Sequence, residues 1–148
     1  MTKIKIGLAG CGFVSELHMY AYRRVYGVEV EVRAVAARGD HVNAFARKHQ
    51  ISNAYRSFAE LVADRELDVI DICTPPNLHA AMIVEAMQAG KHVICEKPLA
   101  HTLEDSARMY QAARESDSVN MVAFNYRRTP AVALAKRYID EGAIGEVL

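Results

Sequence analysis

The chain has little cysteine, no tryptophan and no excess of charge of either sign. Its 148 residues include three cysteines, and 18 basic side chains are balanced by 18 acidic ones. Cys11, Cys73 and Cys95 are an odd number and show no Cys-x-x-Cys spacing, which argues against a disulfide framework and against a zinc site. We therefore expect reduced thiols, a cytoplasmic location and no metal ion.

Long hydrophobic runs and clustered basic residues are also missing. No apolar run approaches the roughly 20 residues that cross a bilayer, so we expect no contact with a membrane. A formal net charge of zero argues against nucleic acid as the main partner, because binding to phosphates needs a surplus of Lys and Arg. The chain is nevertheless 51% hydrophobic and long enough to bury one core without a metal or a disulfide. We expect a single domain over residues 1–148.

Short apolar strands alternate with amphipathic helices along the chain. The expected strands run from Lys3 into the turn at Gly10 and over residues 28–37, 68–73, 92–95 and 121–124. The expected helices begin at residue 13 and after residues 40 and 57, and cover residues 76–90, 102–116 and 129–142. This alternation predicts an α/β fold with a doubly wound parallel sheet of the Rossmann type, in which ligands bind at the carboxyl ends of the strands.

Three of the helices carry patterns that predict their orientation or their first residue. The first has an apolar stripe that should face the sheet, with His18 packed on the same side. The stripe consists of Val14, Leu17, Ala21, Tyr22 and Val25. Asp40 is expected to cap the second helix, and Ser57 with Glu60 should form a capping box at the third.

A glycine-rich turn joins the first expected strand to the first expected helix. The segment Gly10-Cys11-Gly12-Phe13-Val14-Ser15 matches G-x-G-x-x-G, except that Ser15 takes the third glycine position. Gly10 permits a tight turn, Gly12 allows a pyrophosphate to approach the backbone, and the helix N-terminus offers free N–H groups. The third position needs only a small residue, for close helix packing. The predicted dinucleotide contacts are Gly10, Gly12, Phe13 and Val14, and a plain strand-turn-helix corner is the alternative.

The end of the second strand bears on the choice of cofactor. In NAD-binding domains an acidic residue about 20 positions after the glycines bonds the ribose 2′-hydroxyl. Here the strand ends in Ala36-Ala37-Arg38, and an arginine can pair with the 2′-phosphate of NADP and stack on adenine. The sequence therefore favours NADP over NAD. In the alternative, Arg38 is a solvated charge and Asp40 reaches the ribose.

Polar residues follow two further strands at the same edge of the predicted sheet. Lys97 is the catalytic candidate, because its ammonium can hydrogen-bond the oxygen of an alcohol or carbonyl. A surface ion pair with Glu96 is the alternative. For His79, an ordinary place on a helix face is as well supported as contact with a cofactor. The further candidate cofactor contacts are Thr74, Pro75, Asn77, His79, Glu96 and Lys97.

Four segments, spread in order over the chain, carry a specific combination of motifs. They are GLAGCGFVSELH, DVIDICTPPNLHA, AGKHVICEKPLA and FNYRRTPAVALAKRYIDEGAIGEV. Together they resemble the Gfo/Idh/MocA oxidoreductase family, the relatives of glucose-fructose oxidoreductase and inositol dehydrogenase. The resemblance implies that Lys97 is the catalytic lysine, that Glu96 and Pro98 shape a nicotinamide pocket, and that Asn77 and His79 lie beside it.

The last part of the chain also resembles that family. The resemblance implies that residues 126–130, with Arg127, lie near the cofactor, and that Ala37-Arg38 is the variant of relatives that use NADP. It further implies a second, α+β domain that supplies the substrate pocket, further catalytic groups and the oligomer interface. The chain reaches Leu148, where that domain would begin, so residues 1–148 are expected to be the cofactor half. Apolar residues around the last helix and residues 144–148 should then be exposed and favour a homo-oligomer.

The leading interpretation is the cofactor-binding domain of an NADP-dependent oxidoreductase. When whole, it would transfer hydride between nicotinamide and a carbinol carbon of a small sugar, cyclitol or diol-like substrate. The chain alone should bind NADP, with NAD as the alternative, and turn over little or nothing, so whether it is an enzyme by itself stays open. A non-catalytic module that senses NADP or docks on a partner is the second interpretation, and a domain without any nucleotide is the third.

Overall fold

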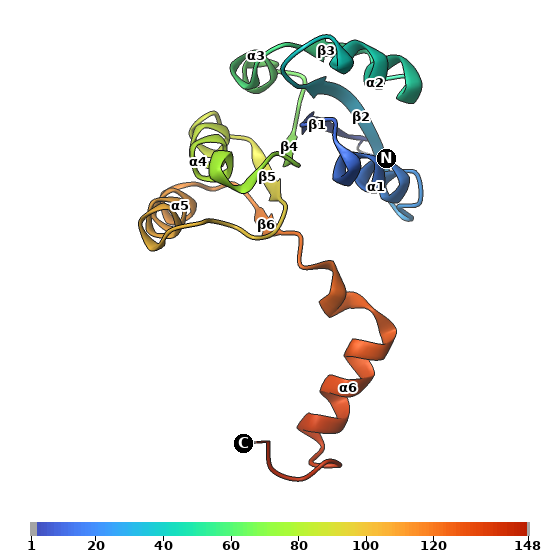
Figure 1. Cartoon of the computed structure of the whole chain (residues 1–148), viewed down its shortest axis with the longest axis vertical. Helices are drawn as coiled ribbons and strands as arrows, with labels where there is room; N and C mark the ends of the chain where they lie inside the picture. Colours follow the sequence, from blue (N-terminus) through green and yellow to red (C-terminus); the bar gives the residue numbers. More distant parts are fainter. Residues whose placement is uncertain (1–2, 148) are drawn as a thin grey trace.

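The computed structural model describes residues 3–147, and within them one sheet of six parallel strands has the order β3-β2-β1-β4-β5-β6 (Figure 1). The strands are β1 (Lys3–Ala9), β2 (Glu29–Ala36), β3 (Asn53–Tyr55), β4 (Val69–Ile72), β5 (His92–Cys95) and β6 (Asn120–Val122). The helices are α1 (Phe13–Tyr22), α2 (His41–His49), α3 (Phe58–Ala63), α4 (His79–Gln88), α5 (Leu103–Glu115) and α6 (Pro130–Asp140), with 3₁₀ turns η1 (Pro76–Leu78) and η2 (Asn125–Arg128). The predicted doubly wound α/β fold is confirmed, whereas β3 has no counterpart among the expected strands.

The order of the strands reverses next to β1. From β1 the chain moves outward through β2 to β3, then returns to β4 on the other side of β1 and continues to β5 and β6. Backbone hydrogen bonds join the ends of the central strands: the Gly10 N–H donates to the Ala36 carbonyl, and the Cys73 N–H donates to the Ala9 carbonyl, each at 2.8 Å. Such a switch point leaves a crevice at the carboxyl ends of the strands, where doubly wound sheets bind ligands.

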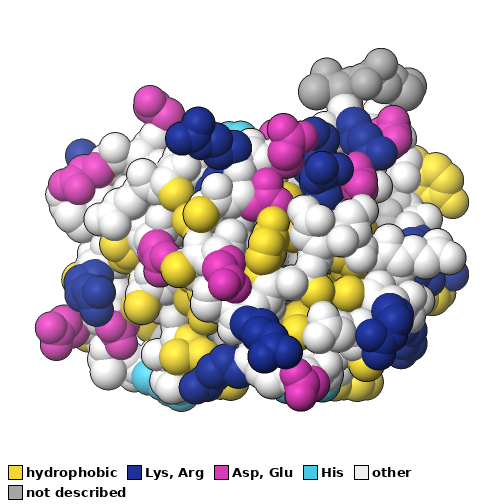
Figure 2. All heavy atoms as spheres, turned by 90° about the horizontal axis from the view of Figure 1, so that it is seen from above, with side chains coloured by type: hydrophobic (Ala, Val, Ile, Leu, Met, Phe, Trp, Pro, Cys, Tyr) yellow, Lys and Arg dark blue, Asp and Glu magenta, His cyan; other side chains and the backbone are white. Residues whose placement is uncertain are grey.

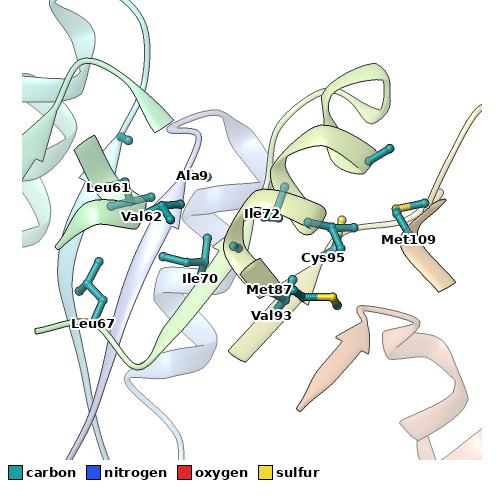
Figure 3. Close-up of a cluster of buried hydrophobic side chains, with 14 of the residues drawn as sticks. Ala9, Leu61, Val62, Leu67, Ile70, Ile72, Met87, Val93, Cys95 and Met109 are labelled. Atoms are coloured by element: carbon teal, nitrogen blue, oxygen red, sulfur yellow. The ribbon is translucent and has the colours of Figure 1, made fainter. Parts of the chain in front are cut away.

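Two hydrophobic layers cover the two faces of the sheet, because alternate strand residues point to opposite faces. The layer beneath α3, α4 and α5 includes Leu61, Ile70, Ile72, Met87 and Met109 (Figure 3). The layer beneath α1 and α2 includes Leu8, Met19, Val35, Val42 and Phe45. Full burial of one such side chain stabilises the fold by about 1.5–3 kcal/mol. The strands are thus held firmly, and the turns that follow them start from fixed positions.

The side of α1 that faces the sheet is partly polar, which corrects the apolar stripe expected from the sequence. Ser15 and Met19 are buried, whereas Leu17, a member of that stripe, is 52% exposed. His18 also faces the sheet, where it hydrogen-bonds Asp71 of β4. Tyr22, another member of the stripe, does reach β4, where its hydroxyl donates to Asp71. The expected stripe is therefore partly wrong, because β4 presents a buried carboxylate to α1 instead of an apolar side chain.

Helices α2 and α3 were both expected to begin with a side-chain cap, but only α3 has a capping hydrogen bond. At α3, Ser57 Oγ accepts a hydrogen bond from the Glu60 N–H, and the Glu60 carboxylate accepts one from the Ser57 N–H, so the predicted capping box is present. At α2, the Asp40 side chain makes no capping hydrogen bond and instead accepts one from Arg56 at 2.8 Å. Asp40 is therefore the N-cap residue of α2, as predicted, but its carboxylate binds the Arg56 guanidinium and does not cap the helix.

Helix α6 extends away from the sheet (Figure 1), and none of its residues is buried. Its large apolar side chains are exposed, as expected from the sequence, at Val132, Leu134, Tyr138 and Ile139. Ile144 and Val147 are also exposed, whereas Leu148 lies outside the described residues. The apolar side of α6 has no partner within residues 3–147.

The surface seen from above carries both signs of charge. Figure 2 shows Lys and Arg side chains mixed with Asp and Glu on that face, without a stripe of one sign, in keeping with the formal net charge of zero. Among the described residues, no helix combines the length and the apolar character needed to cross a bilayer.

Candidate functional site

A pocket of about 970 Å³ lies at the carboxyl ends of β1, β2 and β4. Its walls come from the turn after β1, the end of β2, the segment after β3 and the segment after β4. We call it the glycine pocket. Seven predicted cofactor contacts line it: Gly10, Gly12, Phe13, Val14, Arg38, Thr74 and Pro75. The other five predicted residues, Asn77, His79, Glu96, Lys97 and Arg127, are not among its lining residues.

Glycine stands at positions 10 and 12 of the turn for two different structural reasons. Gly10 has φ +106°, and a Cβ there would stand 2.7 Å from the Cys73 carbonyl oxygen, so a side chain at this position would be strained. Gly12 lines the pocket, and a Cβ there would meet no protein atom within 4 Å. Gly12 therefore leaves open room beside the start of α1, where a bound group can reach the backbone.

The N-terminus of α1 fits the pyrophosphate of a dinucleotide. No side chain caps this helix, so the N–H groups of its first turn are available to a ligand. Ser15, at the third position of the motif, is wholly buried. A small residue is thus required there for close packing of α1 on the sheet, in agreement with the sequence argument.

Basic side chains gather at the β2 end of the glycine pocket. Arg38 is exposed at the end of β2, and His41 and Arg56 line the same end. The Asp40 carboxylate, which was the alternative partner for a ribose, is bonded to Arg56 and does not line the pocket. This end of the pocket therefore presents mainly cationic groups to a ligand.

His79 and Asn77 lie outside the pocket for different reasons. His79 is wholly buried, and its ring nitrogens lie 2.8 Å from the Thr74 carbonyl oxygen and 3.1 Å from the Pro98 carbonyl oxygen. This correction gives His79 a structural role, holding two turns together, in place of direct contact with a cofactor. Asn77 is exposed on η1, away from the lining residues.

Glu96 and Lys97 follow β5 and point in different directions. Lys97 is exposed, and no carboxylate among residues 3–147 forms an ion pair with its ammonium, so the surface ion pair considered from the sequence is absent there. Glu96 turns inward, and its Oε2 accepts a hydrogen bond from the Lys97 backbone N–H at 2.9 Å. The Lys97-Pro98 peptide bond is cis. Because β5 lies beside β4, Lys97 occupies the same sheet edge as the glycine pocket.

Behind this turn lies a group of polar side chains that sequence reasoning missed, which we call the aspartate cluster: Asp71, His18, Tyr22, Cys73 and Glu96. Asp71 Oδ2 accepts hydrogen bonds from His18 Nδ1 at 2.7 Å and from the Tyr22 hydroxyl at 2.8 Å. His18 Nε2 lies 3.1 Å from Glu96 Oε1. The signal was an aspartate in the middle of the apolar run Val69–Ile72, and an interior carboxylate needs donors from its neighbours.

Burial and charge set the protonation of the aspartate cluster. Burial of the His18 ring lowers its pKa, but the hydrogen bond to Asp71 and the charges of Asp71 and Glu96 outweigh this, so the net pKa lies above the ordinary value. Burial, followed by the Asp71 charge, raises the pKa of Tyr22 and of the Cys73 thiol far above their usual range. Tyr22 and Cys73 therefore stay neutral, and the contacts with Asp71 and Glu96 favour the protonated form of His18.

Atoms able to bind a metal also meet in the aspartate cluster. Those of His18, Asp71 and Cys73 lie within 4.8 Å of one another. They are already joined by hydrogen bonds, since Cys73 Sγ is 3.5 Å from His18 Nδ1 and donates to Asp71 Oδ1 at 3.7 Å. Their proximity is thus explained without an ion.

Arg127 lines a hollow other than the glycine pocket, so its predicted contact with a cofactor stays a prediction. With Arg128 and His18 it lines a second hollow of about 300 Å³, between α1 and the β5–β6 end of the sheet. This hollow is separate from the glycine pocket. The structure thus places Arg127 beside His18 of the aspartate cluster and outside the lining of the glycine pocket.

Comparison with known proteins gives the chain a family. Residues 4–124 match the family described as an oxidoreductase family with an NAD-binding Rossmann fold. The chain is 44% identical to levoglucosan dehydrogenase of Pseudarthrobacter phenanthrenivorans, over 100% of this chain and 40% of that protein. It is 35% identical to D-apiose dehydrogenase of Paraburkholderia graminis, over 98% of this chain and 38% of that protein. The chain thus spans about two fifths of the length of these relatives.

Solved structures show the same relationship. A levoglucosan dehydrogenase in complex with NADH and levoglucosan superposes with a TM-score of 0.92 at 42% identity, covering 99% of this chain and 42% of that one. An NAD binding oxidoreductase from Klebsiella pneumoniae superposes with a TM-score of 0.89 at 41% identity, covering 98% of this chain and 40% of that one. The family match, the strand order and the glycine turn agree, and the chain belongs to the Gfo/Idh/MocA oxidoreductase family as its NAD-binding Rossmann domain.

Proposed function

We propose that residues 1–148 are the cofactor domain of an NADP-dependent dehydrogenase that acts on a carbinol carbon of a sugar, cyclitol or diol-like substrate. The observation that carries the proposal is the order of chemical groups along one sheet edge. Adjacent strand ends carry, in turn, Arg38 after β2, the glycine turn after β1, Thr74 after β4 and Lys97 after β5. Neighbouring strands are about 4.8 Å apart, so one extended dinucleotide can reach all four.

The chain's own residues divide the work of binding. The backbone at Gly12 and the start of α1 would hold the pyrophosphate, and Thr74 with Pro75 would border the nicotinamide half. When bound, a nicotinamide cofactor supplies the hydride chemistry that amino-acid side chains lack. Names of relatives support a polyhydroxylated substrate, since they act on levoglucosan and D-apiose.

Lys97 would handle the proton of the substrate alcohol. Its ammonium is exposed at the end of β5, without an ion pair among residues 3–147. A lysine in this position donates a hydrogen bond to an alcohol or carbonyl oxygen, and in its neutral form it takes the alcohol proton. Because no carboxylate in the described part of the chain binds the ammonium, none there diverts its donors from the substrate oxygen.

The preference for NADP rests on the cationic β2 end of the glycine pocket. Arg38, His41 and Arg56 line this end, and the nearby Asp40 carboxylate is bonded to Arg56. A 2′-phosphate would meet hydrogen-bond donors of opposite charge there, whereas a ribose 2′-hydroxyl would find no free carboxylate in the lining. NAD remains the alternative, because the levoglucosan dehydrogenase relative has been solved with NADH.

The dissociation constants of NADP⁺ and NAD⁺, measured by calorimetry for the chain and for Arg38→Ala, test this proposal. We expect the substitution to weaken NADP⁺ about tenfold or more and to change NAD⁺ by less than about threefold, because charge-assisted hydrogen bonds are stronger than neutral ones. Arg47→Ala is the matched control, since Arg47 is an exposed arginine of α2 outside the pocket lining. An unchanged preference would refute the role of Arg38, and failure of both cofactors to bind would refute the function itself.

A further inference from the structure

A chain of hydrogen bonds connects the interior of the sheet to the turn that carries Lys97. It begins at Asp71, which is wholly buried in β4, and passes through the ring of His18 on α1. From His18 it reaches Glu96 Oε1 at 3.1 Å, and Glu96 Oε2 accepts the Lys97 backbone N–H at 2.9 Å. Residues from three elements far apart in the sequence thus form one connected path.

The geometry fixes the charge of the His18 ring. Each ring nitrogen faces a carboxylate oxygen, and an ionised carboxylate accepts hydrogen bonds but donates none. Neutral imidazole has one N–H, so both bonds form together only when the ring is doubly protonated. The cation lies between two anions, in a site where its side chain is 16% exposed.

The other groups around the ring leave this arrangement intact. From its own helix, Tyr22 donates to Asp71, and from β4's end the Cys73 thiol donates to the same carboxylate. From η2, Arg127 and Arg128 line the hollow that His18 also borders. The two arginines are positive and oppose the ring charge, whereas Asp71 and Glu96 are the carboxylates in direct contact and favour it. Histidine is the side chain whose ordinary pKa lies close to neutral pH, and the contacts of the His18 ring raise its pKa above that value.

We propose that His18 is a positioning residue for Lys97: as an imidazolium it fixes the carboxylate of Glu96, and Glu96 fixes the backbone of Lys97 at the sheet edge. The inference rests on the proposed function, because Lys97 acts on the substrate only there. Loss of the ring proton breaks one of the two hydrogen bonds and removes the charge that holds Glu96. The turn after β5 then becomes looser while the sheet beneath it stays in place.

Nuclear magnetic resonance of the isotopically labelled chain tests the link directly. We expect the His18 ring and the Lys97 amide to titrate with one common midpoint, above the ordinary histidine value of about 6.5. In His18→Gln, the Lys97 amide should lose this pH response. Glu96→Gln, which keeps the size of the side chain, should lower the His18 midpoint and abolish the response at Lys97. His49→Gln is the control, because His49 bonds Glu16 on the far side of α1 and should leave both signals unchanged.

Repeating the titration with NADP⁺ and with NADPH separates positioning from a purely structural bond. The oxidised nicotinamide is positive, so NADP⁺ should lower the proton affinity of His18 relative to NADPH by at least about twofold. A Lys97 amide that does not follow His18 overturns the inference. The inference is also overturned if the Gly12 amide shows saturable binding of the cofactors and neither cofactor changes the shared midpoint of His18 and Lys97. If the Gly12 amide shows no binding of NADP⁺ or NADPH, the proposed function is refuted. The positioning role is then refuted with it, even where the hydrogen bond between His18 and Glu96 is present.

Discussion

The glycine pocket and the aspartate cluster lie on the same sheet edge but are built from different interactions. In the glycine pocket the contacts offered to a ligand are backbone groups around Gly12 and exposed cations such as Arg38. In the aspartate cluster, side chains bond one another, and Asp71 at its centre is wholly buried. One region thus leaves its polar groups free for a ligand, and the other satisfies them within the protein. The comparison predicts that changes in the cluster reduce stability, whereas changes to the pocket groups that are open to a ligand reduce binding.

The largest expected effect is at the centre of the aspartate cluster. Asp71→Asn removes the charge that compensates His18 and leaves a buried cation with one carboxylate fewer, so we expect unfolding free energy to fall by about 3 kcal/mol. Urea denaturation measures the loss. Asp140→Asn, at an exposed pair with Lys136, is the matched control and should cost less than about 1 kcal/mol. Equal losses at the two positions would contradict the claim that burial makes the Asp71 interactions important for stability.

The glycine turn allows the comparison to be made within three residues. Gly10→Ala should lower the unfolding free energy by about 2 kcal/mol, because φ is +106° and the Cβ would press on the Cys73 carbonyl oxygen. Gly12→Ala should change stability by less than about 0.5 kcal/mol yet weaken dinucleotide binding, since its methyl group enters the pocket. Denaturation and calorimetry on both variants measure this. Loss of stability at Gly12 without loss of binding would argue against an open cradle there.

The smallest expected effect is the pH dependence of stability that His18 contributes. Its pKa is raised in the folded chain, so the folded state binds the proton more tightly than the unfolded state, whose value is about 6.5. The contribution is therefore complete below about pH 6.5 and is lost as the pH rises through the raised pKa. Urea midpoints between about pH 5 and pH 9 should show this decline in the parent chain and a smaller one in His18→Gln. Parallel curves would show that the ring gains no proton affinity on folding.

The sequence predicted the helices, the glycine turn and every strand except β3 (Asn53–Tyr55) because these depend on local patterns. Hydrophobic period and turn residues are encoded within a few positions, as at Ser57 with Glu60, and the fold follows from their order. The aspartate cluster depends on contacts of His18 with Asp71 and with Glu96, which lie 53 and 78 positions further along the chain. Such pairing is decided by strand order and helix rotation.

The incorrect expectations for α1 and His79 have the same cause, because both depend on contacts between residues far apart in the sequence. The sheet-facing side of α1 was partly misassigned, because the apolar pattern of the helix gave no sign of the carboxylate opposite it. His79 was grouped with the cofactor residues because it is polar and follows a strand, yet tertiary packing turns it inward onto two carbonyl oxygens. In both cases a polar side chain that was expected to serve a ligand or an apolar layer is used to satisfy the interior of the protein.

Helix α6 gives the chain two levels of stability. Its 11 residues contact little beyond η2 (Figure 1), and a helix of that length has only marginal stability in water without tertiary packing. Opening of α6 therefore exposes almost no surface that the sheet had buried, and it proceeds as a local event with its own small free energy. Amide protons of α6 would exchange with solvent through fraying of the helix. Those of β1 or β4 would exchange on a much longer timescale, because their exchange requires the whole sheet to open.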